Sequence, residues 1–269
     1  MPQFAANLSM LWTELPFLDR FDAAAKAGFK AVEFLFPYDH PAQAVADRLT
    51  RNGLQLVLHN LPPGDWAAGE RGIACIPGRE AEFRAGVATA AEYAKVLGTP
   101  RWHCMAGLQP AGVSEAKARA TWVANVRHAA AEAKKLGIQL LIEPINSFDM
   151  PGYFVNRPRQ AIALIDEVMS VGGIDNVFLQ YDIYHAQRME GELANTIRDL
   201  LPRIAHMQLA DNPARNEPGT GEIHWRFLFE VIDALGYRGW IGCEYKPKDA
   251  TPGGTERGLG WMNCHDAAV

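Results

Sequence analysis

The chain has 269 residues, of which 48% are hydrophobic and 21% are charged, enough apolar content for a large core and too much for extended disorder. A net charge of -5 and the lack of any basic run argue against a nucleic-acid partner. Its four cysteines (Cys75, Cys104, Cys243 and Cys264) form no C-x-x-C pair. Neither a signal-peptide pattern nor an apolar run of about 18 residues is visible, so we expect a cytoplasmic protein with reduced thiols and no membrane partner.

Short runs rich in β-branched and aromatic residues alternate with longer amphipathic segments along the whole chain. The runs predict strands at Phe4–Leu8, Ala31–Phe36, Leu54–His59, Trp102–Met105, Ile138–Glu143, Val177–Asp182, Ile204–Leu209 and Trp240–Glu244. Apolar spacing and cap residues predict helices at Phe17–Ala27, Pro41–Leu49, Glu80–Leu97, Ser114–Leu136, Arg159–Met169, Leu193–Leu201 and Trp225–Leu235. Such alternation gives either a closed parallel barrel or a long doubly wound sheet. Eight strands in a chain of this length favour the barrel, so we expect an α/β fold, a (β/α)8 TIM barrel forming a single domain over residues 1–269.

Two segments lie outside this pattern. Residues 60–78 form a long connection without periodicity, and connections of this length are commonly functional lids. We expect an ordered lid whose Trp66 and Glu70 bind the substrate. The Gly-rich tail after Pro247 is expected to wrap loosely around the barrel.

Oxygen-bearing side chains stand at or near the carboxyl ends of four successive predicted strands: Glu143, Asp182, Gln208 and Glu244. In a barrel these ends converge on one face. Three carboxylates that share a partly dry pocket need a cation, and an all-oxygen set favours Mg²⁺ or Mn²⁺ over zinc. Each residue taken alone also has a structural interpretation: an ion pair for either glutamate, a helix cap for Asp182, a backbone hydrogen bond for Gln208.

Other polar residues near the strand ends are candidates for substrate binding. His185 follows Asp182 by three residues and is placed to orient a substrate oxygen, while His59 ends the third predicted strand. Arg215 and Lys246 follow strands seven and eight, where either could bind a substrate carboxylate. Surface positions are the alternative for His185, Arg215 and Lys246.

Polar residues inside predicted strands are interpreted as structural. We expect Glu33 to pair with a neighbouring cation and His206 to fill the barrel interior as a hydrogen-bonded polar group. The G-x-G within PGTGE (218–222) is compatible with a phosphate loop or with a tight turn.

Several longer segments together resemble the hydroxypyruvate isomerase family. They are FAANLSML, VEFLFPYD, GDWAAGERGIACIPGRE, LIEPIN, QYDIYHAQRMEGEL, HMQLADNPARNEPGTGE and GCEYKP. The resemblance runs over nearly the whole chain, and GDWAAGERG and EPGTGE are its most specific strings. The wider group is the xylose-isomerase-like barrels, which include ketose 3-epimerases, and the 2-oxo-tetronate isomerases of the same branch have almost identical motifs.

The resemblance implies that Glu143, Asp182, Gln208 and Glu244 hold the metal and that the two glutamates are the proton donor and acceptor. The epimerases carry His where this chain has Gln208, and a second acidic residue after strand five that corresponds to Asp149. It also implies interconversion of hydroxypyruvate and 2-hydroxy-3-oxopropanoate, with the small 2-oxo acid as partner and a homo-oligomer as a further expectation. The alternatives are 2-oxo-tetronate isomerase, ketose 3-epimerase and a non-catalytic sugar-acid binding module. A related endonuclease would need several His ligands and a basic groove.

Overall fold

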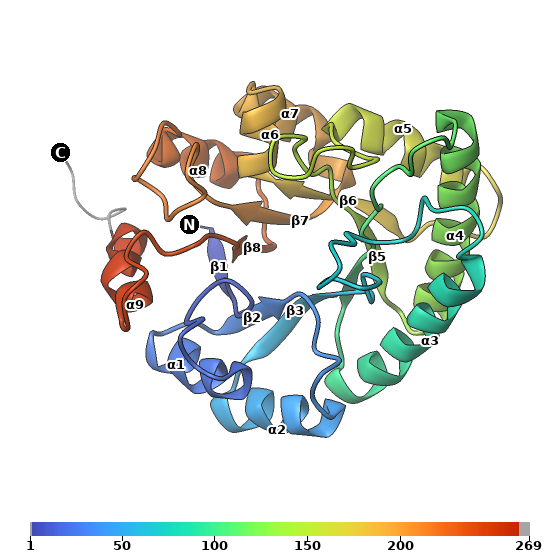
Figure 1. Cartoon of the computed structure of the whole chain (residues 1–269). Helices are drawn as coiled ribbons and strands as arrows, with labels where there is room; N and C mark the ends of the chain where they lie inside the picture. The colour runs from blue at the N-terminus through green and yellow to red at the C-terminus, as the bar shows by residue number, and fades with distance from the viewer. Residues whose placement is uncertain (1, 264–269) are drawn as a thin grey trace.

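A computed structural model of the chain describes residues 2–263. Its parallel strands close into one barrel in chain order (Figure 1). The strands are β1 (Gln3–Asn7), β2 (Ala31–Phe34), β3 (Gln55–Asn60), β4 (Arg101–His103), β5 (Gln139–Ile142), β6 (Val177–Asp182), β7 (Ile204–Leu209) and β8 (Trp240–Cys243). The predicted barrel is confirmed, and each strand ends within two residues of its predicted bounds.

Helices surround the barrel as an outer layer (Figure 1). They are α1 (Arg20–Lys26), α2 (Ala42–Asn52), α3 (Glu80–Leu97), α4 (Glu115–Lys135), α5 (Pro158–Met169), α6 (Ile183–Met189), α7 (Leu193–Leu200), α8 (Trp225–Ala234) and α9 (Gly254–Gly258), with 3₁₀ turns η1 (Phe17–Asp19), η2 (Leu201–Arg203) and η3 (Leu259–Asn263). Over the described range, no helix combines the length and apolar character needed to cross a membrane.

Local chemistry explains where these helices begin and end. The Ser114 hydroxyl caps α4 by accepting a hydrogen bond from the Lys117 backbone N–H, as predicted. Helix α2 runs three residues past its predicted end, to Asn52, because the left-handed turn that stops it lies at Gly53, with φ of 60°.

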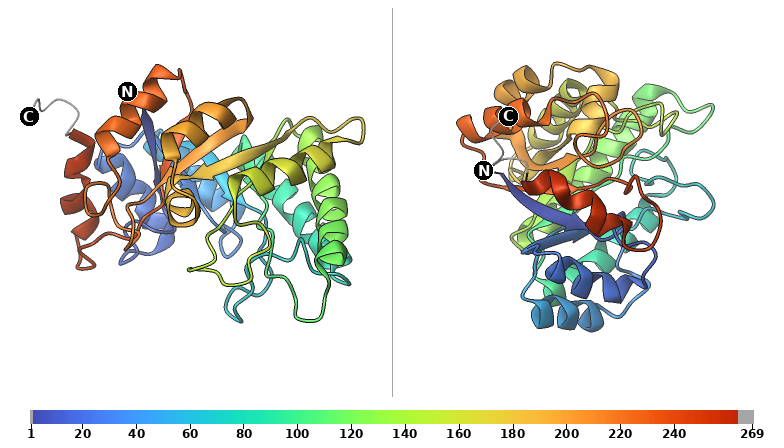
Figure 2. Two further views of the ribbon diagram at one scale, coloured as in Figure 1. Left: turned by 90° about the horizontal axis from the view of Figure 1, so that it is seen from above. Right: turned by 90° about the vertical axis from the view of Figure 1, so that its left-hand side faces the viewer.

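The C-terminal segment is more ordered than expected, so the prediction of a loose wrap is wrong. It forms α9 and η3, and Figure 2 shows this segment beside the N-terminal strand β1. The Trp261 ring lies 4.9 Å from that of Phe4, edge to face, and stacks at 6.3 Å on that of Phe229. Aromatic packing of this kind fixes the segment against the barrel wall.

The barrel interior changes character along its axis. An apolar layer holds Ala5, Ala31, Val57, Leu58 and Leu141. Closer to the carboxyl ends lies a polar layer, in which Gln180 of β6 pairs in register with His206 of β7, and Asn7 of β1 with Glu33 of β2. Gly242 of β8 leaves room for the Glu33 carboxylate, since a Cβ at position 242 would collide with it. A packed polar layer therefore supports the floor of the barrel mouth.

The structure describes three of the four cysteines. Cys75, Cys104 and Cys243 are buried free thiols. Cys264 lies outside the described residues.

Candidate active site

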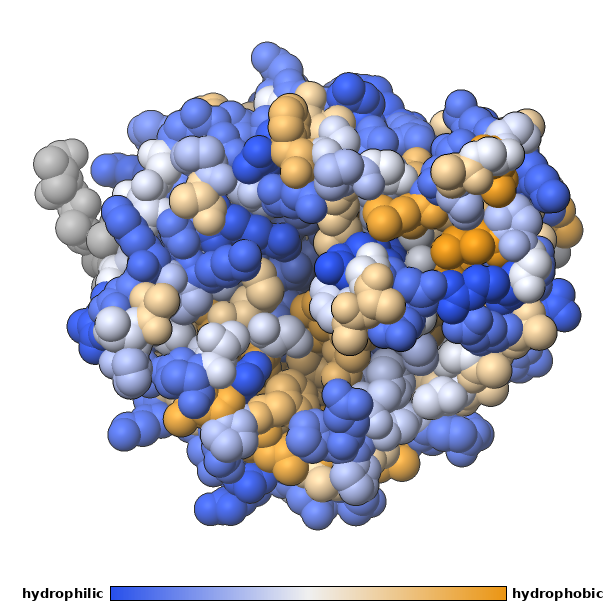
Figure 3. Space-filling view, in the orientation of Figure 1, coloured by the Kyte–Doolittle hydropathy of each residue, from blue (hydrophilic) through white to orange (hydrophobic). Residues whose placement is uncertain are grey.

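A cavity of about 510 Å³ opens between the loops at the carboxyl end of the barrel. Figure 2 shows long loops extending from one end of the barrel, and Figure 3 shows the face of the molecule hollowed near its centre. Six of the predicted site residues line the cavity: Glu143, Glu244, His185, Arg215, Lys246 and Trp66. Asp182 and Gln208 are buried.

The tightest cluster of possible ligands joins Glu143, Asp182 and His185, whose ligand atoms all lie within 4.8 Å of one another. Nε2 of His185 lies 3.6 Å from Oε1 of Glu143 and 3.7 Å from Oδ2 of Asp182. Asp182 also fulfils its structural interpretation, because its Oδ1 accepts hydrogen bonds from the backbone N–H groups of Tyr184 and His185 and so caps α6. One oxygen caps the helix and the other faces the site.

The carboxylates of this site are buried and short of partners. Oε1 of Glu143 and Oδ2 of Asp182 have no hydrogen-bond partner among the residues that the structure describes. The guanidinium of Arg215 supplies one positive charge, 2.7 Å from Glu244 and 3.8 Å from Asp182. Buried carboxylate oxygens without partners are costly, so this set fits a bound cation. The two unpartnered atoms are carboxylate oxygens, a type of ligand common at divalent cation sites.

The pKa values follow from the same crowding. Burial, together with the neighbouring carboxylates, raises the pKa of Glu143 well above its usual range. Burial raises the pKa of Glu244 to about 8 and that of Asp182 to about 6, although Arg215 opposes both shifts. The site therefore disfavours three simultaneous negative charges unless positive charge is added.

Gln208 contacts the site with its amide nitrogen. Nε2 donates to Glu244, and it donates to Oε1 of Glu33 at 2.8 Å, while Oε1 accepts from Gln180 Nε2 at 2.6 Å. An amide nitrogen cannot ligate a cation, so Gln208 becomes a ligand only if its amide turns over. The predicted ligand role of Gln208 thus stays a prediction.

The hydrogen bonds of Asn146 define the protonation of His185. Oδ1 of Asn146 accepts from the backbone N–H groups of Phe148 and Asp149, at 3.0 and 2.8 Å, so its Nδ2 is the group that lies 2.6 Å from Nδ1 of His185. Nδ1 therefore accepts, and the proton sits on Nε2. Burial lowers the pKa of His185 well below its usual value, which keeps the ring neutral. This tautomer presents an N–H toward the cavity, as expected of a group that orients a substrate oxygen.

Asp149 also lines the cavity. It accepts hydrogen bonds from the Tyr184 hydroxyl at 2.8 Å and from Nδ2 of Asn146 at 3.0 Å, and it lies 3.6 Å from Arg188. Asp149 thus connects the loop after β5 with helix α6.

Two residues predicted to bind substrate lie elsewhere. His59 is buried among the rings of Phe34, Tyr38 and Trp102, and it is the next residue, Asn60, that lines the cavity. Strand residues alternate between faces, so a shift of one position exchanges the two.

Glu70 is the second correction. Its carboxylate pairs with Arg79 and accepts from the backbone N–H of Asp65 at 2.5 Å. Glu70 therefore ties the ordered loop 60–78 to the start of α3 and is not one of the residues that line the cavity.

Among the cavity residues that sequence reasoning missed are His103 and Arg71. Nδ1 of His103 lies 3.5 Å from Oε2 of Glu143. His103 ends β4, so the signal was present in the sequence, but the predicted strand ran on to Met105 and hid it. Arg71 follows Glu70, and no pattern in the sequence distinguishes it from its neighbours.

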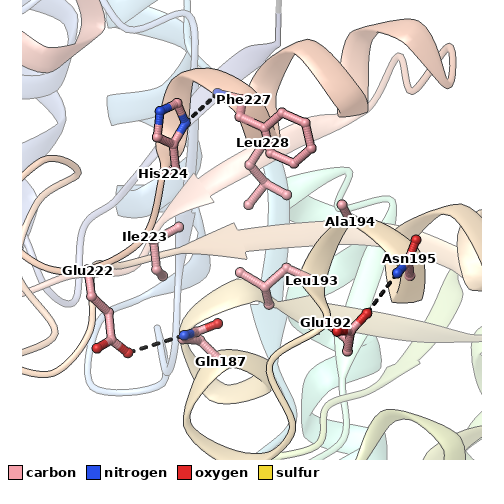
Figure 4. Close-up of a pocket in the computed structure, with 10 residues that line it drawn as sticks. All are labelled: Gln187, Glu192, Leu193, Ala194, Asn195, Glu222, Ile223, His224, Phe227 and Leu228. Carbon is pink, nitrogen blue, oxygen red and sulfur yellow. Dashed lines mark hydrogen bonds between the residues drawn. The ribbon is translucent and has the colours of Figure 1, made fainter.

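A second cavity, of about 260 Å³, lies on the outer surface between α6, α7 and α8 (Figure 4). Its polar groups pair with one another: Gln187 donates to Glu222 at 3.1 Å, and Asn195 donates to Glu192 at 2.7 Å. No unpartnered buried oxygen is found among the residues drawn there. This cavity therefore lacks the unpartnered carboxylate oxygens that are found at the barrel mouth.

The fold and the mouth of the barrel define a class of protein. The family model described as xylose isomerase-like TIM barrel matches residues 21–264, and the chain belongs to this family. Hydroxypyruvate isomerase of Escherichia coli K12 is 55% identical over 98% of this chain and 99% of its own length. A 2-oxo-tetronate isomerase of Cupriavidus necator is 52% identical over 97% of this chain and 98% of its own length. The family resemblance drawn from the sequence is confirmed.

Solved structures extend the comparison. A Brucella melitensis protein described as AP endonuclease, family 2, superposes with a TM-score of 0.92 at 46% identity, covering 98% of both chains. A 3-keto-D-glucoside 4-epimerase of E. coli superposes with a TM-score of 0.82 at 19% identity, covering 98% of this chain and 99% of its own. The latter similarity shows the shared fold alone.

Proposed function

We propose that the chain is an isomerase of short 2-oxo acids that interconverts hydroxypyruvate and 2-hydroxy-3-oxopropanoate. The main observation is that two carboxylates, Glu143 after β5 and Glu244 after β8, meet in one cavity although their strands are not neighbours in the barrel. The E. coli hydroxypyruvate isomerase, at 55% identity over nearly full length, supports this substrate class.

The reaction is a balanced proton transfer. A proton leaves C3 of hydroxypyruvate and a proton is added at C2, while the hydroxyl proton passes from the oxygen on C3 to the oxygen on C2. The intermediate between the two steps is an enediolate. Glu143 and Glu244 take the roles of base and acid, and a positioned acid–base group typically contributes about 10²–10⁴-fold in rate. His185, with its proton on Nε2, is placed to donate to a substrate oxygen.

Glu143, Asp182 and Glu244 would hold a divalent cation, with Gln208 as a fourth ligand after rotation of its amide. When bound, Mg²⁺ or Mn²⁺ polarises the substrate carbonyl and stabilises negative charge on oxygen. The unpartnered oxygens of Glu143 and Asp182 support this assignment. The loop 60–78, which the Glu70–Arg79 ion pair holds against the start of α3, would limit access of water to the reacting carbons.

A 2-oxo-tetronate isomerase is the second candidate, because the C. necator enzyme is 52% identical. The site chemistry is the same, and the acid is one carbon longer. A ketose 3-epimerase would use the same carboxylates on an uncharged sugar, and the epimerase structures support only the fold.

The test is a substrate panel with metal depletion. The purified chain, stripped with a chelator and then reloaded with Mg²⁺ or Mn²⁺, is assayed on hydroxypyruvate, 2-oxo-tetronate and hexuloses. We expect turnover of one of the acids that is lost on chelation and restored by metal. Equal turnover of the chelated protein would contradict the metal assignment, and binding without turnover of any substrate would favour a sugar-acid binding module.

A further inference from the structure

Among the described residues, two of the positive side chains that line the cavity at the barrel mouth form no ion pair with a carboxylate. Four cations line it: Arg71, Arg188, Arg215 and Lys246. Arg215 lies 2.7 Å from Glu244, and Arg188 lies 3.6 Å from Asp149. For Arg71 and Lys246, no ion pair with a carboxylate occurs within residues 2–263. Arg71 and Lys246 are therefore the lining cations whose charge no carboxylate pairs with in the described part of the chain.

Arg71 is held in a defined position. Its guanidinium carbon lies 4.0 Å from the centre of the Trp66 ring, and its Nη1 donates to the backbone carbonyls of Glu70 and Trp66 at 2.6 and 3.1 Å. Neutral carbonyl groups thus accept from Nη1 of Arg71, and the other N–H groups of its guanidinium have no hydrogen-bond partner among the described residues. Lys246, in contrast, has an exposed side chain with no hydrogen bond or ion pair to residues 2–263.

The loop around Arg71 fixes its direction. Gly72, with φ of 95°, packs so closely on the Met105 carbonyl that a Cβ there would collide with it. Its backbone N–H donates to the Pro63 carbonyl at 2.9 Å. With Glu70 bound to Arg79 on the other side, residues 70–72 are anchored at both ends, so Arg71 is delivered to the cavity wall by a rigid turn.

A planar guanidinium with free N–H groups matches the two oxygens of a carboxylate. We propose that Arg71 binds the carboxylate of the substrate and thereby selects 2-oxo acids over uncharged ketoses of similar length. The inference rests on the proposed function, since it assigns the group that recognises the substrate class. It also differs from the sequence-based expectation, in which Arg215 or Lys246 bound this carboxylate. Arg215 is already committed to Glu244.

The test compares Arg71→Met, Arg71→Lys and Lys246→Met on the metal-loaded enzyme with hydroxypyruvate. For Arg71→Met we expect KM to rise about 10–100-fold while kcat stays within about threefold, because the carboxylate is bound alike in the ground and transition states. In Arg71→Lys we expect a smaller rise of KM, since lysine keeps the positive charge but lacks the planar guanidinium that can donate two hydrogen bonds to a carboxylate. A damaged loop would lower kcat and would not be rescued by lysine.

Three results would overturn the inference: an unchanged KM in Arg71→Met, a fall confined to kcat, or a larger rise of KM in Lys246→Met than in Arg71→Met. The last would make Lys246 the anion-binding group. Failure of the proposed function is a separate outcome, because it appears in the wild-type enzyme as absence of turnover on every 2-oxo acid, and the inference then falls with it.

Discussion

The barrel contains two sets of buried carboxylates, one within the polar layer of the interior and one at the mouth. Glu33 in the interior is fully bonded. Its Oε2 accepts from Nε2 of His206 at 2.6 Å, and its Oε1 accepts from Asn7 at 2.9 Å and from Gln208 at 2.8 Å. This arrangement fits the predicted structural role, with His206 as the partner.

At the mouth, Glu143 and Asp182 are as deeply buried as Glu33, yet each has an oxygen without a partner. The same chemical group is therefore satisfied in one place and left available in the other. An unsatisfied buried carboxylate is costly and is typical of binding sites, whereas the hydrogen bonds of Glu33 are typical of a structural group. Burial by itself does not distinguish the two.

The strongest test of this contrast is Glu244→Gln at the mouth. The change removes a proton-transfer group while keeping the shape of the side chain, so we expect kcat to fall by about 10²–10⁴-fold with the fold intact. Because Arg215 and Gln208 donate to this carboxylate, an amide there should also lower the free energy of unfolding by about 1–3 kcal/mol. Turnover is measured by a coupled assay for the aldehyde product, and unfolding by circular dichroism. Wild-type turnover in this variant would remove Glu244 from the proposed chemistry.

Cation binding at the mouth should depend on pH. The pKa of Glu244 is raised to about 8 and that of Asp182 to about 6, so a cation must displace protons below these values. Affinity for Mn²⁺ should therefore increase by about tenfold for each pH unit between pH 6 and 8 from Glu244 alone, and the raised pKa of Glu143 adds to this dependence. Calorimetry in two buffers of different ionisation enthalpy measures the released protons. Glu244→Gln should flatten the dependence, and an equally steep slope in that variant would contradict the assignment.

The matched change in the interior is Glu33→Gln. Three donors converge on the Glu33 carboxylate, and an amide would turn its own N–H₂ toward at least one of them. We expect a loss of roughly 1.5–3 kcal/mol in the free energy of unfolding, measured by urea denaturation. Turnover should fall less than in Glu244→Gln. If Glu33→Gln lost turnover to the same extent with unchanged stability, the distinction between the two sets would fail.

The fold was predictable because the alternating strands and helices of a barrel produce a regular pattern of apolar residues in the sequence. Apolar runs and Gly caps marked the strands and most helices, and the carboxyl ends of the strands pointed to Glu143, Asp182 and Glu244. These side chains were found because a parallel barrel places every strand end on one face, whatever the loops do.

What the pattern could not give was the pairing between side chains distant in sequence. Glu70 and Arg71 are neighbours of similar polarity, and only the partner of Glu70, Arg79, shows that one anchors the loop and the other faces the cavity. The PGTGE turn shows the same limit. Its Gly219 and Gly221 N–H groups donate to the Asp211 carboxylate, both at 2.9 Å, so the loop binds a residue of its own chain in the way that phosphate loops bind an anion.

The smallest expected effect concerns His59, which lies one residue before Asn60, a residue that lines the cavity. Both of its ring nitrogens are buried without hydrogen-bond partners in the described part of the chain, and burial lowers its pKa to about 3, so the ring is neutral. Replacing it by leucine removes unsatisfied polar atoms at nearly constant volume. We therefore expect His59→Leu to change the free energy of unfolding by less than about 1 kcal/mol and to leave kcat/KM unchanged.

His103→Leu, in the adjacent strand, is the control: His103 lies 3.5 Å from Glu143, so its loss should reduce turnover. A fall of kcat/KM in His59→Leu as large as that in His103→Leu would return His59 to the site, because nothing in its aromatic surroundings otherwise connects it to the chemistry.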